Sequence, residues 1–456
     1  MRTTVLRGIQ AASLTALLLA SGCSGGAARA PGLDGSGTGS GTIVWLAGPE
    51  TETASDDVRQ VLVDAFEQAY PSITVNLVTG PNSTDTLRST LHRELSAGAV
   101  TPDVYSGDIV WPYQFARDKL ALPLSNYLPR SFWNRFGSPG TPGSGATMVA
   151  AMRYRGAEYA VPYFVDEGFL YYRKDLLARA GLRPPATWEQ LVQDSAVLKE
   201  HGLPYQFVWQ GNNYEGLTCD WYEIMADAFG RPPARASTAA QLDSPPALKA
   251  LDFLRALITT GVSPRNTDTF EEPDADNAFD SGHAAFLRSW DSSYANALSS
   301  TSAIASPQKV GVEPPPAFQG QPGPGWSVLG GWSLFVNPHT RHLRADLTFI
   351  KWMASVQAQR ILATQYQEIP TVASVRTDPA IVAGSPVLQA AARTRPVSRP
   401  SATADYQKIT NAVHGNIYAA LPGPSSAGQN PCQALVNAAR EIDPGVHGTL
   451  RCPARS

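Results

Sequence analysis

The stretch VPYFVDEGFLYYRKDLLARAGLRPPATWEQL, residues 161–191, decides the fold of this chain. Its run of aromatic and aliphatic residues at 169–172 predicts a buried strand, which leads into a helix near Asp175. Thr187 is followed three residues later by Gln190, the pattern of a capping box, so a further helix is expected to begin there. Strand and helix therefore follow one another along this stretch.

The same alternation is already present near the start of the chain. Apolar residues predict a strand at 43–46, and those at 58–69 recur at helical spacing until Pro71 ends the helix. A half-buried strand at 73–77, a helix at 87–95 and a third strand at 102–105 complete a βαβαβ order, which favours an α/β architecture with largely parallel sheets. Later helices are expected at 246–260, 345–363 and 406–420, and loops rich in Pro and Gly at 137–146, 231–246 and 313–325.

Length and composition exclude several classes of protein. The roughly 415 residues after residue 41 exceed what one core usually holds, so two domains are expected. Charged residues make up 16% of the chain, the net charge is −3, and there is no basic run, so nucleic acid is not an expected partner. No stretch after residue 41 approaches 18 uninterrupted apolar residues, which excludes a membrane-spanning helix there.

The first 23 residues resemble the signal of a bacterial lipoprotein. Two arginines precede an apolar stretch at 9–20, and Ala20-Ser21-Gly22-Cys23 is a small-residue cleavage site, although Leu is commoner where Ala20 stands. The resemblance implies lipidation of Cys23 and an anchor at the outer face of the cell membrane, with residues 24–41 as a flexible linker of Gly, Ser, Thr and Ala. An ordinary secretory signal, with Cys23 as a bystander, is the alternative.

Three cysteines remain after Cys23. Cys432 and Cys452 are expected to form a disulfide in an exported chain, and Cys219 is then a buried free thiol. No Cys/His cluster has the spacing of a zinc site, and neither a metal nor a cofactor is expected.

The segment 161–191, with its Val-Pro-Tyr, Leu-Tyr-Tyr-Arg-Lys-Asp-Leu-Leu and Pro-Ala-Thr-Trp-Glu-Gln-Leu motifs, resembles the extracellular solute-binding proteins of the maltose- and trehalose-binding type. The Phe-Glu-Gln-Ala-Tyr-Pro run at 66–71 is similar to the opening of the same family. Weaker similarities are Gly-His-Ala-Ala-Phe at 282–286, ahead of Trp290, and Gly330-Gly331-Trp332. The likeness covers nearly the whole mature chain.

This resemblance implies a periplasmic-binding-protein-like type II fold, with two α/β lobes joined by a hinge and a ligand cleft between them. Lobe 1 would hold residues 42–163 and 332–372, and lobe 2 residues 164–331 and 373–456. The hinge would lie near 162–166 and 330–332. It also implies a monomeric, non-enzymatic receptor that captures a sugar and delivers it to the permease subunits of an ABC importer.

A sugar has apolar ring faces and a rim of hydroxyl groups, so its pocket needs flat aromatic side chains and fixed polar groups. Such side chains converge on loops at the carboxyl ends of strands. The candidate ligand-binding residues are Glu50, Glu52, Asp108, Trp111, Asp166, Tyr214, Glu215, Trp290, Asp291, Gly331, Trp332 and Arg399.

Each candidate also has an ordinary structural interpretation. The two glutamates near residue 50 could be solvated, and Asp108 could cap the helix expected near Trp111. Asp166 could serve only the hinge, and Glu215 lies in a Gly-Asn-Asn stretch that is also typical of a surface turn.

Trp290 and Trp332 could be core residues. The family resemblance implies an arginine near the C-terminus that reaches into the cleft, and either Arg399 or Arg395 could be that residue. The missing side chain of Gly331 could let a ligand approach the backbone.

Two other functions remain open from sequence. A secreted glycoside hydrolase also lines a sugar cleft with acids, although the one Gly-x-Ser-x-Gly, at 22–26, lies in the processing site and linker rather than at a strand-to-helix turn. A receptor for a peptide or a polyamine is the second alternative, because an anionic cleft suits a polyamine.

Overall fold

The computed structural model describes residues 37–48, 57–81, 83–138, 145–200, 202–232 and 238–452. The signal at 1–23 with its lipidation candidate Cys23, most of the linker, and the ligand candidates Glu50 and Glu52 lie outside the described residues. Within the described ranges, no helix combines the length and the apolar character needed to cross a bilayer.

Strands and helices alternate along the chain, as the sequence predicts. The strands are β1 Gly41–Ala47, β2 Ile73–Thr79, β3 Val104–Asp108, β4 Arg153–Tyr154, β5 Ala157–Glu158, β6 Val161–Glu167, β7 Phe169–Arg173, β8 Tyr205–Val208, β9 Ala284–Ser289, β10 Val310–Glu313, β11 Trp326–Val336, β12 Ile369–Pro370 and β13 Arg395–Ser398. The helices are α1 Val58–Ala69, α2 Thr84–Ser96, α3 Pro112–Arg117, α4 Arg130–Trp133, α5 Gly145–Ala151, α6 Lys174–Arg179, α7 Trp188–Lys199, α8 Glu215–Phe229, α9 Thr238–Leu242, α10 Pro245–Thr259, α11 Glu272–Asp280, α12 Ser293–Ala297, α13 Leu343–Met353, α14 Val356–Gln365, α15 Ala373–Arg376, α16 Pro379–Gly384, α17 Pro386–Ala391, α18 Tyr406–Ala420 and α19 Pro431–Ile442.

Two sheets organise these elements. The first has the order β12-β6-β11-β3-β1-β2, with β13 also paired to β11, and the second has the order β10-β7-β9-β8. Strand β1 pairs in parallel with β2 and β3, as the βαβαβ order requires. The remaining parallel pairs are β8 with β9 and β11 with β13.

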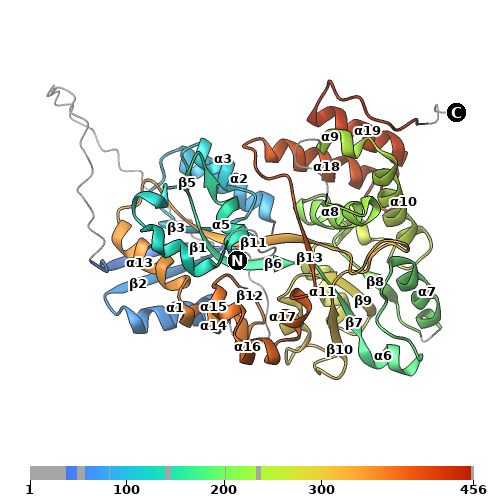
Figure 1. Ribbon diagram of the computed structural model, residues 1–456, viewed down its shortest axis with the longest axis horizontal. Helices are drawn as coiled ribbons and strands as arrows, with labels where there is room; N and C mark the ends of the chain where they lie inside the picture. The colour runs from blue at the N-terminus through green and yellow to red at the C-terminus, as the bar shows by residue number, and fades with distance from the viewer. Residues whose placement is uncertain are drawn as a thin grey trace, which may run out of the picture. The chain divides into compact units, whose positions relative to one another are not determined.

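The expectation of largely parallel sheets is wrong. Strand β11 pairs antiparallel with both β3 and β6, β12 pairs antiparallel with β6, and β7 pairs antiparallel with β9 and β10. The reason is the path of the chain, because β6 leads from the first sheet into β7 of the second, whereas β11 brings the chain back. Figure 1 shows β6 and β11 between strands β1–β3 and strands β7–β10.

The two sheets define two lobes, each with its own aromatic core. In the first lobe the ring of Phe349 lies 5.2 Å from that of Trp45 and 5.1 Å from that of Phe66. In the second lobe Trp188 contacts the rings of Phe207 and Phe253. Aromatic pairs of this kind contribute about 0.5–1.5 kcal/mol each beyond their area burial.

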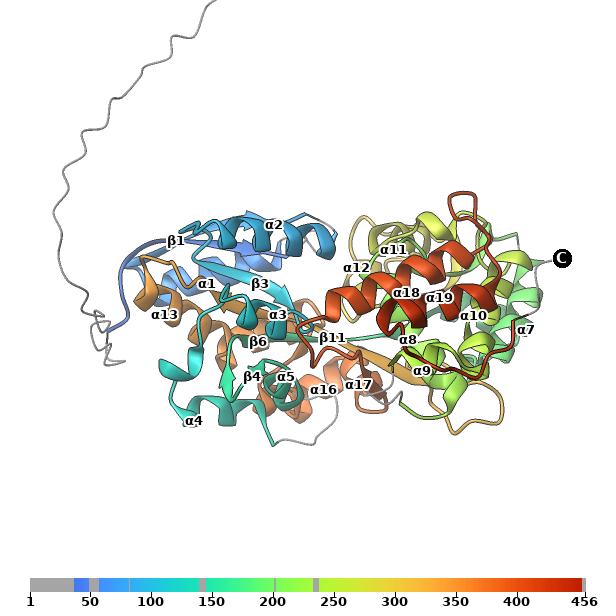
Figure 2. The same cartoon turned by 90° about the horizontal axis from the view of Figure 1, so that it is seen from above.

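The last third of the chain packs against both lobes. Helices α15 and α16 contact α14, on the side of the first sheet, whereas α18 and α19 pack on each other and against α8 and α10. Figure 2 shows α18 and α19 side by side next to α8. The lobe boundaries given above stay a prediction.

The helix boundaries and loops predicted from local sequence patterns are confirmed only in part. Thr187 is the N-cap of α7 and accepts a hydrogen bond from Gln190 N, whereas the side chain of Gln190 reaches the backbone of Ala186 rather than that of Thr187. The helix expected at 345–363 is two helices, because Ser355 caps a new one, α14. The loop expected at 231–246 contains the short helix α9.

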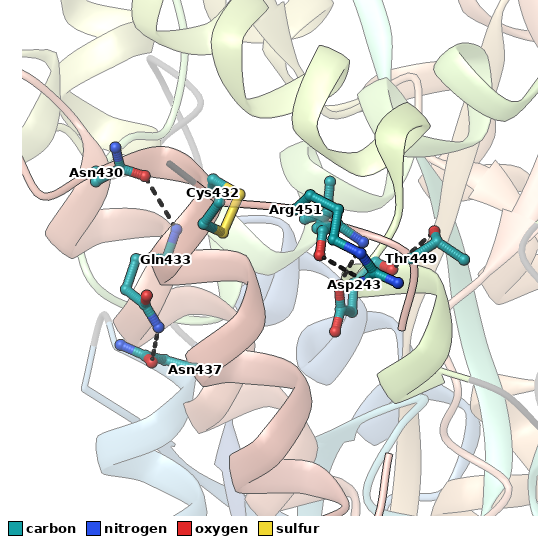
Figure 3. Close-up of a disulfide and its surroundings, with 9 residues drawn as sticks. Asp243, Asn430, Cys432, Gln433, Asn437, Thr449 and Arg451 are labelled. Atoms are coloured by element: carbon teal, nitrogen blue, oxygen red, sulfur yellow. Dashed lines mark hydrogen bonds between the residues drawn. A yellow bond between two sulfur atoms is a disulfide. The ribbon is translucent and has the colours of Figure 1, made fainter. Parts of the chain in front are cut away.

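Cys432 of α19 forms a disulfide with Cys452, the pair expected from sequence, and Cys219 is buried and free within α8. The segment before Cys452 is held at Asp243, between α9 and α10 (Figure 3). Thr449 N donates to the backbone oxygen of Asp243 at 2.9 Å, and Leu450 N donates to its carboxylate at 3.0 Å. The disulfide therefore fastens the end of the described chain onto the second lobe.

Candidate functional site

Three of the predicted residues, from distant parts of the chain, form one ion-pair cluster. Asp108 is the last residue of β3 in the first sheet, Glu215 is the first residue of α8, and Arg399 directly follows β13. Arg399 Nη2 donates to Asp108 Oδ1 at 3.0 Å, and Nη1 donates to Glu215 Oε1. Arg399 is only 2% exposed, so a buried cation pairs with one carboxylate from each lobe.

Helix α18 supplies further partners for Glu215. The hydroxyl groups of Tyr406 and Thr410 donate to the Glu215 carboxylate, with Thr410 Oγ1 at 2.6 Å. Burial raises the pKa of Glu215 to about 7, and the charge of Arg399 counteracts part of that rise. Neither Tyr406 nor Thr410 is recognisable as a site residue from its sequence pattern, because their contact with Glu215 depends on how α18 packs on α8.

Asp108 is not the N-cap of α3, which was the alternative interpretation of this residue. Trp111 is the N-cap of α3, and Asp108 Oδ1 accepts instead from Val110 N at 3.0 Å. Arg395 lies away from the cluster, because its guanidinium stacks on Trp326 at 4.0 Å and donates to Pro324 O. Arg399 is thus the arginine at the junction of the lobes.

A second cluster contains carboxyl groups alone. One oxygen each from Asp166 of β6, Asp291 after β9 and Glu368 before β12 lie within 4.8 Å of one another. Burial, and next the neighbouring carboxylates, raise the pKa of Asp166 well above its usual range. Asp291 Oδ2 accepts from Ile369 N at 2.8 Å. Glu368 carried no signal in the sequence, because β12 beside it has only two residues.

The predicted aromatic residue Trp290 is held from two sides. Its indole Nε1 donates to Glu272 Oε1 at 3.2 Å, and the guanidinium of Arg288 lies 4.3 Å from its ring centroid. The phenol of Tyr214 donates to the other oxygen of Glu272 at 2.7 Å. Glu272, which the sequence did not single out, therefore connects two predicted ligand residues, and Trp290 keeps part of its surface exposed.

Arg288 is itself fixed inside the second lobe. It forms ion pairs with Asp220 and Glu223, each at 2.8 Å, and all three side chains are buried. Because the guanidinium cannot rotate without breaking these pairs, the indole ring above it has a rigid base.

The other aromatic candidates lie in the first lobe. Trp111 stacks on Phe115 at 5.4 Å and meets the edge of Trp332 at 6.2 Å. Gly331 has φ +129, and a Cβ there would lie 2.7 Å from Phe164 O. The close approach at Gly331 thus comes from the protein's own backbone, and contact with a ligand stays a prediction.

A small cavity adjoins Arg399. It has a volume of about 100 Å³ and is lined by Ile109, Val110, Tyr113 and Leu329 among others. Small-molecule sites usually have about 300–1,000 Å³, so this space suits about three water molecules. Beside this cavity, side chains of the two lobes contact one another directly through Arg399.

The family of bacterial extracellular solute-binding proteins matches residues 50–360. A probable ABC transporter-binding protein of Deinococcus radiodurans is 30% identical over 365 residues, which cover 78% of this chain and 83% of the relative. A mannitol-binding protein of Pseudomonas aeruginosa is 29% identical over 217 residues, 46% of this chain and 48% of the relative. The structure of maltose-bound T. maritima MalE3 superimposes with a TM-score of 0.75 at 29% identity, covering 88% of this chain and 98% of that one.

Proposed function

We propose that this chain, which belongs to the family of bacterial extracellular solute-binding proteins, binds a sugar or polyol between its lobes and delivers it to the permease of an ABC importer. The observation that carries the proposal is the junction of the lobes itself. There an arginine–carboxylate cluster lies across the two lobes, and the second lobe adds the buried Tyr214 and the partly exposed Trp290, joined through Glu272.

The chemistry of these groups suits a neutral polyhydroxylated solute. The indole of Trp290 offers a flat apolar face for ring C–H groups, and Asp108 and Glu215 accept hydrogen bonds from hydroxyl groups. Arg399 supplies a rigid fork of donors. Support for a sugar or polyol also comes from two relatives at 29% identity, one named as a mannitol-binding protein and one solved with maltose.

Binding would proceed through a hinge. Strand β6 of the first sheet continues into β7 of the second after a single residue, Gly168, and β11, an 11-residue strand of the first sheet, brings the chain back after β10. Rotation about these two connections would part Asp108 from Glu215 and admit the solute. The solute would then favour the closed arrangement, because only that arrangement lets both lobes contact it.

The first test identifies the ligand. Mass spectrometry of small molecules retained on the purified chain is expected to find a hexose, a disaccharide or a hexitol. A titration of tryptophan fluorescence with maltose, trehalose and mannitol is expected to show one saturable response. If none of the three, nor any retained carbohydrate, changes the fluorescence at millimolar concentration, the assignment to sugars and polyols fails.

The test for an enzyme uses the same ligand. Incubation of the chain with the sugar it binds is expected to leave that sugar intact. Release of a monosaccharide would instead favour a glycoside hydrolase.

The proposal includes the lipid anchor at Cys23. Cys23→Ala is expected to release the chain from the membrane fraction into the medium. A chain that remains in the membrane fraction after this substitution would contradict the anchor.

A further inference from the structure

The carboxyl cluster of Asp166, Asp291 and Glu368 is built from three separate parts of the chain. Asp166 and Glu368 belong with the first sheet, on β6 and directly before β12, whereas Asp291 follows β9 of the second sheet. One oxygen from each side chain lies within 4.8 Å of the other two. The cluster therefore lies where the lobes meet.

Two oxygen atoms of this cluster are buried without a hydrogen-bond partner. They are Oδ1 of Asp291, a residue with 0% exposure, and Oε2 of Glu368, which is 2% exposed. The phenol oxygen of Tyr163, three residues before Asp166, is also buried and unpartnered.

In the described part of the chain no Lys, Arg or His side chain forms an ion pair with the cluster, although the charge of Arg399 lowers the pKa of Asp166 somewhat. Arg399 forms its ion pairs with Asp108 and Glu215, and Arg376 lies beside Glu167 at 4.0 Å. A buried polar atom without a partner costs about 1–3 kcal/mol, and more when it is charged. Burial first, and then the charge of a neighbouring carboxylate, raises the pKa of each of the three groups well above its usual range. A cation would therefore bind in competition with protons.

The donor set indicates which kind of cation would fit. All ligand atoms are carboxylate oxygens, which suit hard divalent ions rather than zinc or copper. Ca²⁺ binds oxygen at about 2.3–2.6 Å, so oxygens on opposite sides of one ion are up to about 5 Å apart. Each pair of carboxylate oxygens, within 4.8 Å, is therefore close enough to share one ion. A bulky organic cation would need space beside Asp291 and Glu368, which are almost fully buried, whereas Asp166 is partly exposed.

We propose that Asp166, Asp291 and Glu368 form a divalent-cation site of the calcium type that joins the two lobes. Because Asp291 comes from one lobe and its two partners from the other, a bound ion would hold the lobes together. The site would not depend on which solute the chain carries, and its test needs no sugar.

The test is a calcium titration of the full chain after treatment with EDTA. Calorimetry is expected to show one site, with a dissociation constant of about 10⁻⁴–10⁻³ M, the range of extracellular calcium modules. The melting temperature is expected to rise with calcium concentration, because the ion binds only the folded chain. Magnesium, which demands shorter bonds and near-octahedral geometry, is expected to bind more weakly.

Asp291→Asn and Glu368→Gln identify the ligands. Each removes a charge but keeps the size of the side chain, so both variants are expected to fold, with a melting temperature in EDTA no lower than that of the parent. Each is expected to weaken calcium binding at least tenfold. The matched control is Asp194→Asn, which removes another buried carboxyl, on α7, and is expected to leave binding unchanged.

Two results would overturn the proposal. One is the absence of saturable calcium binding up to about 10 mM, ten times the weakest affinity expected. The other is binding that persists unchanged in both variants. Glucosamine and spermidine are titrated in parallel. If calcium does not bind, but one of these amines binds to the parent chain and not to the two variants, the cluster holds an organic ammonium group. The proposal of a metal site is then wrong.

Discussion

Arg399 Nη2 lies 3.0 Å from Asp108 Oδ1, although 291 positions of sequence separate the two residues. The same guanidinium contacts Glu215 of the second lobe. The side chain of Arg399 thus pairs with one carboxylate from each lobe. The contact between the lobes and the proposed binding of a solute therefore depend on the same guanidinium group.

Replacing Arg399 by Met is expected to destabilise the chain strongly. Removal of one partner from a buried ion pair leaves uncompensated carboxylates, which costs about 3–5 kcal/mol. Urea unfolding measures the free energy. The control is Arg393→Met, whose pair with Glu313 is exposed and is expected to contribute about 0–1 kcal/mol. Equal effects of the two substitutions would show that burial of the Arg399 cluster does not matter.

Glu272 is expected to position Trp290 and Tyr214 for the proposed ligand. Glu272→Ala removes the acceptor of both side chains, so the indole and phenol lose their fixed orientation and the sugar affinity falls, by about tenfold for a loss of about 1.4 kcal/mol. Glu272→Gln keeps an acceptor oxygen and is expected to restore most of the affinity. Calorimetry with the identified sugar checks this, and full affinity in the alanine variant would remove Glu272 from the site.

Deprotonation of Asp227 is expected to lower the free energy of unfolding between about pH 4 and about pH 8. Burial raises the pKa of Asp227 to about 8, and the charge of Glu223 adds to the rise. Hydrogen bonds from Trp188 Nε1 and Trp326 N, together with the charge of Arg395, lower the pKa in part. The folded chain therefore keeps a proton that the unfolded chain has already lost. This stabilisation is complete below the ordinary aspartate pKa of 3.8 and is lost as the pH rises through about 8.

Asp227→Asn removes this proton, and urea unfolding at several pH values is expected to give a shallower slope. The control is Asp378→Asn. Hydrogen bonds from the backbone of Ala380 and from Arg360 lower the pKa of Asp378, so its contribution changes only under more acidic conditions. An unchanged slope in Asp227→Asn would contradict a buried, protonated Asp227.

Replacing Cys432 and Cys452 by Ser is expected to cost about 3 kcal/mol, from the loop entropy of a crosslink over 20 residues. Because the linked segment contacts Asp243, amide exchange is expected to increase first near 443–452 and α9. Exchange that increases only in the first lobe would be inconsistent with this attachment.

The sequence predicted the features that depend on local patterns. The strand and helix of 161–191, the cap at Thr187 and the helix at 406–420 follow from residues that are close along the chain. Three of the candidates for the site, Asp108, Glu215 and Arg399, are in direct contact with one another, and their contact with a ligand stays a prediction.

The missed residues share a physical cause. Glu272, Glu368 and Tyr406 enter the site through the packing of separate elements, and no spacing in the sequence reports such contacts. The antiparallel pairing of β11 was missed for the same reason, because it depends on where a late strand inserts into an early sheet.

A solute site between the lobes can be tested by calorimetry. The native chain, Trp290→Ala and Trp326→Ala are each titrated with the sugar or polyol that the native chain retains. Trp326 lies beneath Arg395 and away from the junction cluster. One binding site is expected in the native chain and in Trp326→Ala, and at least tenfold weaker binding in Trp290→Ala. Equal binding by all three chains, or no binding by the native chain, would contradict a solute site between the lobes.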